Sequence, residues 1–158
     1  NRSRKRCSKL PCGCGSMERG RLCAKSSESS TTAKAPAQPM PRWSLLRHTG
    51  APDDPSGCHF DLLLEDGETC RTWRLNQPPE LDQTPQPAAA LPNHRLVWLE
   101  PRSAAVSGNR GWAERVMAGH YSGALPAEPS VAVQVLLEDG DLQGVLLISG
   151  ERCELRRA

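Results

Sequence analysis

The segment 59–67, which reads His-Phe-Asp-Leu-Leu-Leu-Glu-Asp-Gly, constrains the fold more than any other stretch of this chain. Successive side chains of a β-strand point to opposite faces of its sheet. As a strand, the segment places His59, Asp61 and Leu63 on one face and three apolar side chains on the other. Two potential metal ligands held on a strand are a natural start for a metal site. The alternative is an ordinary two-faced strand whose His and Asp face solvent.

The rest of the chain from Trp43 onward reads as short strands separated by turn-forming residues. The pair Asp-Gly at 66–67 predicts one hairpin, and Asp-Gly-Asp at 139–141 predicts another. The proline-rich segment 76–92 is predicted to be a long surface loop, because proline cannot donate to a strand ladder. Strands are expected over residues 43–48, 59–65, 68–75, 95–100, 112–117, 131–138, 142–149 and 153–157. About seven to eight strands, without an amphipathic helix, predict an all-β fold in the form of a closed or nearly closed antiparallel β-barrel.

Residues 1–39 differ in composition from the remainder. They hold a basic stretch, then Gly and Cys, then Ser and Thr, and finally Pro and Ala, with no periodic apolar positions. This composition predicts a disordered, dispensable tail. The cysteines of the tail do not have the paired spacing usual for zinc ligands, so a zinc site is disfavoured there. These cysteines are Cys7, Cys12, Cys14 and Cys23. Because Met-Pro-Arg-Trp at 40–43 reads like a natural protein start, we expect one folded domain over 40–158, preceded by an unstructured leader or by residues foreign to the natural protein.

The formal net charge of +2 argues against a broadly basic protein that coats nucleic acid. Any contact with nucleic acid is expected to be local, on a face that carries arginines. We find neither an apolar run of the roughly 18 residues that a membrane span needs nor a secretory signal. The cysteines outside the tail, Cys58, Cys70 and Cys153, are widely scattered. Scattered cysteines favour reduced thiols, and we expect a cytoplasmic, monomeric protein without membrane contact.

Six segments, in order, resemble one family. Residues 59–65 resemble the His-Tyr-Asp-Leu-Arg-Leu-Glu signature of the 3′-phosphoesterase domain of bacterial DNA ligase D. They are more similar still to stand-alone bacterial relatives, called DNA polymerase ligase-like proteins, which read His-Trp-Asp-Leu-Met-Leu-Glu. Further similar segments lie at 43–48, 71–75, 91–96, 106–111 and 119–121. The resemblance covers about residues 40–158 and implies a phosphoesterase-like β-barrel.

The resemblance also implies a site. In the family, two histidines and an aspartate hold a divalent metal, usually manganese, and the matching residues are His48, His59 and Asp61. Mixed imidazole and carboxylate ligands suit manganese and also zinc. His94 matches a further active-site histidine, so a catalytic role is expected for it. The gap between the two metal histidines, residues 49–58, is longer than in ligase D, which a loop insertion explains without moving either ligand.

Two positions depart from the family pattern. Leu63 stands where the family has a phosphate-gripping arginine, and Trp98 stands where ligase D members have a tyrosine. Leucine cannot form the two charged hydrogen bonds that an arginine guanidinium donates to a phosphate, so the phosphate-binding site is expected to be degraded. An arginine restored by Leu63→Arg is expected to raise activity. The phosphate-binding residues stay unassigned, with five candidates for a substitute cation: Arg47, Arg71, Arg74, Arg95 and Arg110.

Three functions fit these residues. The first is a metal-dependent phosphoesterase (a hydrolase) that acts on 3′ ends of DNA or RNA in bacterial DNA end repair, with weakened activity, beside a ligase or polymerase of that repair. The second is an inactive barrel that binds nucleic-acid ends or a repair partner. The third and least favoured is a non-haem iron oxygenase, in which His59, Asp61 and a distant His120 form the two-His-one-carboxylate site. This third class expects an arginine clamp after the last His, and residues 121–129 contain no arginine.

Overall fold

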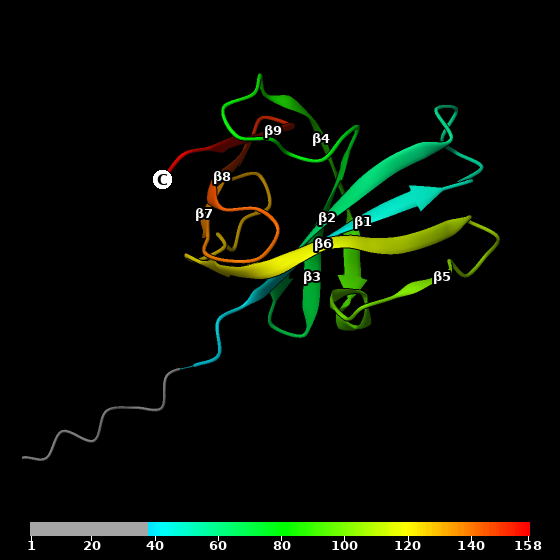
Figure 1. Cartoon of the computed structure of the whole chain (residues 1–158), viewed down its shortest axis with the longest axis horizontal. Coiled ribbons are helices and arrows are strands. Elements are labelled where there is room, and N and C mark those ends of the chain that lie inside the picture. Colours follow the sequence, from blue (N-terminus) through cyan, green and yellow to red (C-terminus); the bar gives the residue numbers. More distant parts are fainter. Residues whose placement is uncertain (1–37) are drawn as a thin grey trace, which may run out of the picture. The chain divides into compact units, whose positions relative to one another are not determined.

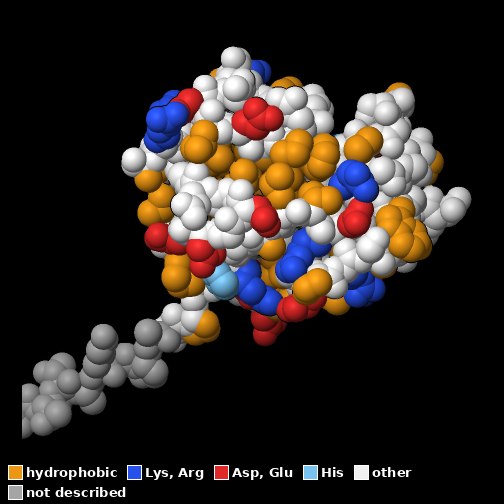
Figure 2. Space-filling view, viewed as in Figure 1, with side chains coloured by type: hydrophobic (Ala, Val, Ile, Leu, Met, Phe, Trp, Pro, Cys, Tyr) orange, Lys and Arg blue, Asp and Glu red, His pale blue; other side chains and the backbone are white. Residues whose placement is uncertain are grey.

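The computed structural model describes residues 38–158, which belong to one compact unit. The predictions of a disordered tail and of a disfavoured zinc site at its cysteines fall on residues 1–37 and so lie outside the described residues. No helix within 38–158 has both the length and the apolar character required to cross a membrane. Basic and acidic side chains are interspersed on the face that Figure 2 shows.

The described residues form an all-β antiparallel fold, as the sequence predicts, with nine strands where about seven to eight were expected (Figure 1). Eight of the strands are hydrogen-bonded in a ring of order β1-β2-β3-β4-β9-β8-β7-β6, which the pairing of β6 with β1 completes. The pairings β4–β9 and β6–β7 are short, so the barrel is nearly closed. The strands are β1 (Arg42–Thr49), β2 (Cys58–Asp66), β3 (Thr69–Leu75), β4 (Gln86–Arg95), β5 (Ser103–Ala105), β6 (Trp112–Ser122), β7 (Val133–Leu137), β8 (Gly144–Ser149) and β9 (Arg152–Arg156).

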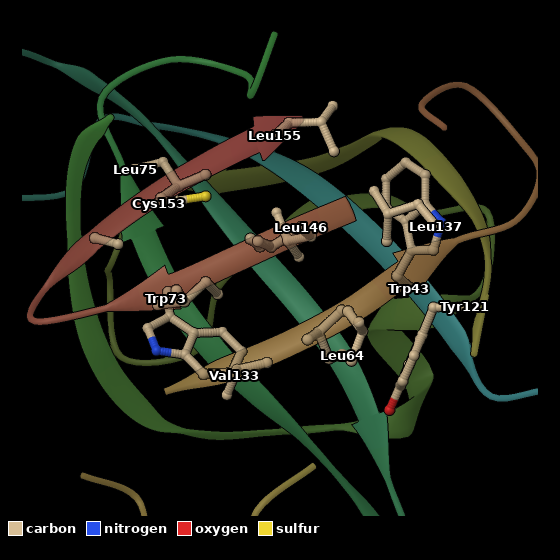
Figure 3. Close-up of a cluster of buried hydrophobic side chains, with 14 of the residues drawn as sticks. Trp43, Leu64, Trp73, Leu75, Tyr121, Val133, Leu137, Leu146, Cys153 and Leu155 are labelled. Carbon is tan, nitrogen blue, oxygen red and sulfur yellow. The ribbon is translucent and has the colours of Figure 1, made fainter. Parts of the chain in front are cut away.

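The main apolar core draws side chains from all eight strands of the ring and therefore fills its interior (Figure 3). We call these buried side chains the inner cluster. Alternate residues of β2, Leu62 and Leu64, belong to it and are fully buried. The inner cluster consists of Trp43, Leu45, Leu62, Leu64, Trp73, Leu75, Ala88, Tyr121, Val133, Val135, Leu137, Leu146, Ile148, Cys153 and Leu155.

A second, smaller cluster lies on the opposite face of β1 and β2. A single turn of 3-10 helix, η1 (Leu96–Leu99), packs Trp98 and Leu99 against this face, and Ser44 of β1 donates a hydrogen bond to the Trp98 carbonyl (3.2 Å). We call it the outer cluster; it consists of Leu46, Leu63, Cys70, Trp98, Leu99 and Ala113. Both faces of β2 are thus covered, which rules out the alternative of an ordinary strand with one face in solvent.

The region 76–100 differs from the prediction. Strand β4 runs from Gln86 to Arg95 where a loop was expected to continue to residue 92, and η1 replaces the expected strand over 95–100. An irregularity accommodates Pro92 in the strand: Cys70 pairs with His94 but Thr72 pairs with Leu91, so β4 has an extra residue around Pro92. A bulge of this kind tolerates proline and redirects the side chains that follow it. The short strand β5, which pairs with β6 outside the ring, was not predicted.

Candidate metal centre

Two histidines face each other at one end of the hairpin pair β1–β2. His48 near the end of β1 and His59 near the start of β2 are direct cross-strand partners, and their ring centroids lie 4.7 Å apart. Asp61 follows on the same face of β2, as the strand alternation predicts. One ligand atom from each of the three residues lies within 4.8 Å of the others. All three side chains are buried, with exposures of 8%, 3% and 2% for the residues in chain order.

The ring nitrogen of His48 that points away from Asp61, Nε2, is held by a backbone carbonyl. His48 Nε2 lies 2.7 Å from the carbonyl oxygen of Arg110. Because a carbonyl oxygen only accepts, Nε2 carries a proton and donates it, and in the neutral imidazole Nδ1 is left with a lone pair. That Nδ1 atom faces Asp61 Oδ2 at 3.5 Å, too far for a strong hydrogen bond. The carboxylate of Asp61 raises the pKa of His48 above its usual value, while burial acts in the opposite direction.

The ring nitrogen of His59 that points away from Asp61, Nδ1, is held in the same way by a carboxylate. His59 Nδ1 lies 2.6 Å from Asp54 Oδ2. Hydrogen bonds from Ser56 and from His59 lower the pKa of Asp54 to about 2, so this carboxylate is ionised at neutral pH and accepts the Nδ1 proton. The other ring nitrogen, Nε2, then presents its lone pair to Asp61 Oδ1 at 3.6 Å.

These contacts leave several buried polar atoms without a partner. Within residues 38–158, five buried side-chain N or O atoms have no hydrogen bond, and three of them are His48 Nδ1, His59 Nε2 and Asp61 Oδ1. Buried polar atoms are nearly always paired, because leaving one unpaired costs about 1–3 kcal/mol. When the imidazoles are neutral, their two nitrogen lone pairs also repel the carboxylate that they face. A divalent cation among the three atoms relieves both costs, and a hydrogen bond on the other ring nitrogen is the usual arrangement of a metal-binding histidine.

A cavity of about 650 Å³ opens beside His48 and Asp61. Four arginines contribute to its lining: Arg74, Arg95, Arg102 and Arg110. The other lining residues that bear on the site are Asp53, His94 and Trp98. The cavity therefore combines a buried carboxylate-imidazole cluster with a cationic wall, which suits an anionic ligand that also contacts a metal.

His94 enters this cavity from β4. Its Nε2 lies 3.8 Å from Asp61 Oδ2, and its Nδ1 lies 3.0 Å from the carbonyl oxygen of Pro92. Nδ1 therefore donates to that carbonyl, and Nε2 is free to accept a proton within the cavity. The structure thus brings together all four residues expected at the site, His48, His59, Asp61 and His94. Their roles as ligands and catalyst stay predictions.

The two departures from the family pattern have different surroundings. Leu63 is fully buried in the outer cluster and is not among the described residues that line the cavity. An arginine at this position would have to displace apolar neighbours, so the expected gain from Leu63→Arg does not fit its surroundings. Trp98 does line the cavity, and the guanidinium carbon of Arg102 lies 5.0 Å from its ring centroid, a cation–π distance.

Three other candidate residues from the sequence lie away from the cavity. Arg47 pairs with Glu114 on the surface, and Arg71 donates to the carbonyl of Pro126, so neither lines the cavity. His120 pairs with Asp139 and lies opposite Arg42, at the other end of β1 from His48. The iron-binding set of His59, Asp61 and His120 is therefore not assembled in the fold.

Sequence reasoning missed Asp53 and Asp54 in the loop between β1 and β2, and Arg102 after η1. The loop was read only as a turn-rich insertion, although an acidic pair between two candidate ligand histidines is a signal for residues that orient them. Neither the known family models nor the curated proteins include a match to this chain.

Proposed function

We propose that this protein is a metal-dependent phosphoesterase that acts on 3′ ends of DNA or RNA in DNA end repair. One observation carries the proposal: three buried ligand atoms converge without partners of their own at the wall of a cavity lined by arginines. The first requirement of a metal-assisted reaction on a phosphate ester is a cation site open to the substrate. The second is positive charge for the substrate's remaining oxygens.

His48 Nδ1, His59 Nε2 and Asp61 would hold the metal. Two imidazoles and one carboxylate suit manganese, which the family resemblance favours, and zinc is the alternative. A bound ion of this kind polarises a phosphoryl oxygen and lowers the pKa of coordinated water. The protein itself supplies orientation: the Arg110 carbonyl and the Asp54 carboxylate lock the two imidazoles with their lone pairs toward Asp61.

His94 is the candidate proton carrier. With Nδ1 donating to the Pro92 carbonyl, Nε2 takes up or gives a proton inside the cavity, close to Asp61. Such a histidine can protonate a leaving alkoxide or hold a phosphate oxygen, depending on its protonation state. General acid–base catalysis by one positioned side chain typically contributes a factor of about 10²–10⁴ in rate.

A specific observation also favours the alternative, a barrel that binds nucleic-acid ends or a repair partner without turnover. The position where the family has a phosphate-gripping arginine is occupied by Leu63, which is packed in the outer cluster. On this alternative the cationic wall remains a binding surface for nucleic-acid ends. Recruitment of a ligase or polymerase, residence in a bacterial cytoplasm and a monomeric state belong to the proposal under either alternative.

The test is incubation of the protein with manganese and a primer–template that bears a 3′-phosphate or a 3′-terminal ribonucleotide. We expect release of inorganic phosphate or of the terminal nucleoside by the wild-type protein and none by Asp61→Ala. His94→Gln is expected to lower the rate by about 10²–10⁴-fold while manganese still binds.

The matched control is Arg157→Gln, because Arg157 pairs with Asp82 on the surface (2.9 Å) and does not line the cavity. This variant should retain the wild-type rate. A wild-type protein that binds manganese but yields no product from either substrate would contradict the enzyme and leave the binding-only alternative.

A further inference from the structure

We infer that Arg74 binds the substrate's phosphate in place of the arginine missing at position 63, and that Asp53 occupies Arg74 until the phosphate displaces it. The inference rests on the proposed function, because it assigns the phosphate-binding residue of that same site. It makes Arg74 a binding residue and Asp53 an internal competitor of the substrate.

The position of Arg74 follows from strand register. Arg74 of β3 is the direct cross-strand partner of Asp61 of β2. Side chains of directly opposed residues lie on the same face of a sheet, with Cβ atoms about 4.5–5.5 Å apart. The Arg74 side chain therefore leaves the backbone beside the side chain of Asp61, and it lines the same cavity as His48 and His94. A phosphate that contacts an ion at Asp61 is within reach of this arginine.

The hydrogen-bonding capacity of Arg74 is largely unused. Its Nε is buried and has no partner within residues 38–158, and its Nη1 contacts Asp53 Oδ2 at 3.3 Å, outside the range of a short charge-assisted bond. A guanidinium has five N–H donors in a fork that matches the oxygens of a phosphate. A buried donor with no partner, on a side chain that lines a cavity beside a metal-type cluster, indicates a ligand that completes the hydrogen bonding of the guanidinium.

The other arginines of the cavity are less suited to this role. Arg110 donates from Nε to the Ser107 carbonyl in its own turn, and Arg102 lies over the Trp98 ring. Both are exposed, as is Arg95. Charges at the rim of a cavity are better placed for the neighbouring backbone phosphates of a nucleic-acid strand than for the phosphate at the metal.

Asp53 is held near Arg74 by its neighbour. Asp54 is fixed through His59 on one carboxylate oxygen and through Ser56 on the other. This anchors the loop so that the Asp53 carboxylate, which is 66% exposed, reaches the guanidinium. A carboxylate oxygen on an arginine is the electrostatic equivalent of a phosphate oxygen. Because the Asp53 side chain is so exposed and its contact long, an incoming phosphate can replace it at small cost.

The experiment is a calorimetric titration of inorganic phosphate into the manganese-loaded protein, with manganese affinity measured separately for every variant. Arg74→Gln should weaken phosphate binding by about ten- to hundredfold, the usual loss for hydrogen bonds to a charged group. Arg74→Lys should fall between Arg74→Gln and the wild type, because it keeps the charge but not the fork. Asp53→Asn should tighten phosphate binding severalfold in the wild-type background and have no effect in the Arg74→Gln background.

The surface pair Arg157–Asp82 provides matched controls, and Arg157→Gln and Asp82→Asn should leave phosphate binding unchanged. Manganese affinity should be the same in all the variants. Wild-type phosphate affinity in Arg74→Gln, no phosphate binding by the wild-type protein, or an Asp53→Asn effect that persists without Arg74 would each overturn the inference.

The outcome is separable from that of the proposed function. Phosphate binding that depends on Arg74, without turnover of a 3′-phosphate substrate, would uphold the inference and contradict the enzyme. Turnover that is unchanged in Arg74→Gln would do the reverse.

Discussion

The two faces of β2 bury different kinds of side chain, apolar on one face and mainly polar on the other. On one face Leu62 and Leu64 contribute purely apolar side chains to the inner cluster. On the other face His59 and Asp61 are buried just as deeply, but with polar atoms left unpaired among the described residues. The strand thus stabilises the fold on one side and, on the other, holds groups that cost stability unless something binds them.

This difference distinguishes the part of the barrel that stabilises the fold from the part that could hold a ligand. A protein tolerates unpaired buried groups mainly where their use compensates for the cost. The inner face fixes the positions of the strands, and the register of β1, β2 and β3 then brings His48, Asp61 and Arg74 to one place. Substitutions on the inner face should therefore change stability, and substitutions on the polar part of the other face should change ligand binding.

The largest effect on stability is expected from Leu63→Arg. Position 63 lies on the same face of β2 as the candidate ligands, but in its apolar part. Leu63 is fully buried among apolar neighbours and does not line the cavity. An unpaired charge buried there should cost about 3–5 kcal/mol of unfolding free energy. Denaturant unfolding of Leu63→Arg, with Leu63→Met as the volume-matched control, measures the loss. A stable Leu63→Arg protein with raised activity would instead restore the interpretation of position 63 as a phosphate site.

A slightly smaller loss is expected from Leu62→Ala on the inner face. Removing a fully buried leucine side chain leaves a cavity, and such substitutions cost about 2–5 kcal/mol of unfolding free energy. Manganese affinity of the folded protein, measured by calorimetry below the unfolding transition, should be unchanged. A loss of manganese affinity without a loss of stability would show that the two faces are not independent.

Asp54→Asn should act on binding rather than stability. The Asp54 carboxylate accepts a hydrogen bond from His59 Nδ1 and so orients the imidazole. Loss of such a partner typically weakens metal binding by about 10–100-fold. Calorimetric titration with manganese measures this effect, with Asp82→Asn on the surface as the control. Equal manganese affinities in Asp54→Asn and the wild type would mean that His59 is not a ligand or needs no such support.

The fold was largely predictable because the apolar positions and turns agree. The hairpin of β2 and β3 across Gly67, and that of β7 and β8 across Gly140, both follow from alternation bounded by turn residues. The region of β4 and η1 was not predictable, because proline argued against a strand and the bulge that admits Pro92 depends on tertiary pairing. The short apolar run Leu-Val-Trp-Leu at 96–99 fits a strand or a helical turn equally well.

The candidate site was predictable only in part. Alternation placed His59 and Asp61 together, and the resemblance added His48 and His94, which the structure brings to the same cavity. The sequence offers Arg74 as one of five candidate cations and Asp54 as part of an acidic pair between two candidate histidines, but it singles out neither residue. Their significance depends on loop anchoring and on cross-strand register, neither of which a linear pattern encodes.

Asp61→Asn gives the most direct test of the central claim, that the buried cluster is a cation site. The asparagine amide can donate to one of the facing histidine lone pairs, so the variant without metal should unfold at or above the wild-type temperature. Manganese at about 100 times its dissociation constant should stabilise the wild-type protein by about 2.7 kcal/mol and leave Asp61→Asn unchanged. Thermal unfolding of both proteins with and without manganese decides the matter. Equal manganese effects on the two proteins, or none on the wild type, would contradict the account.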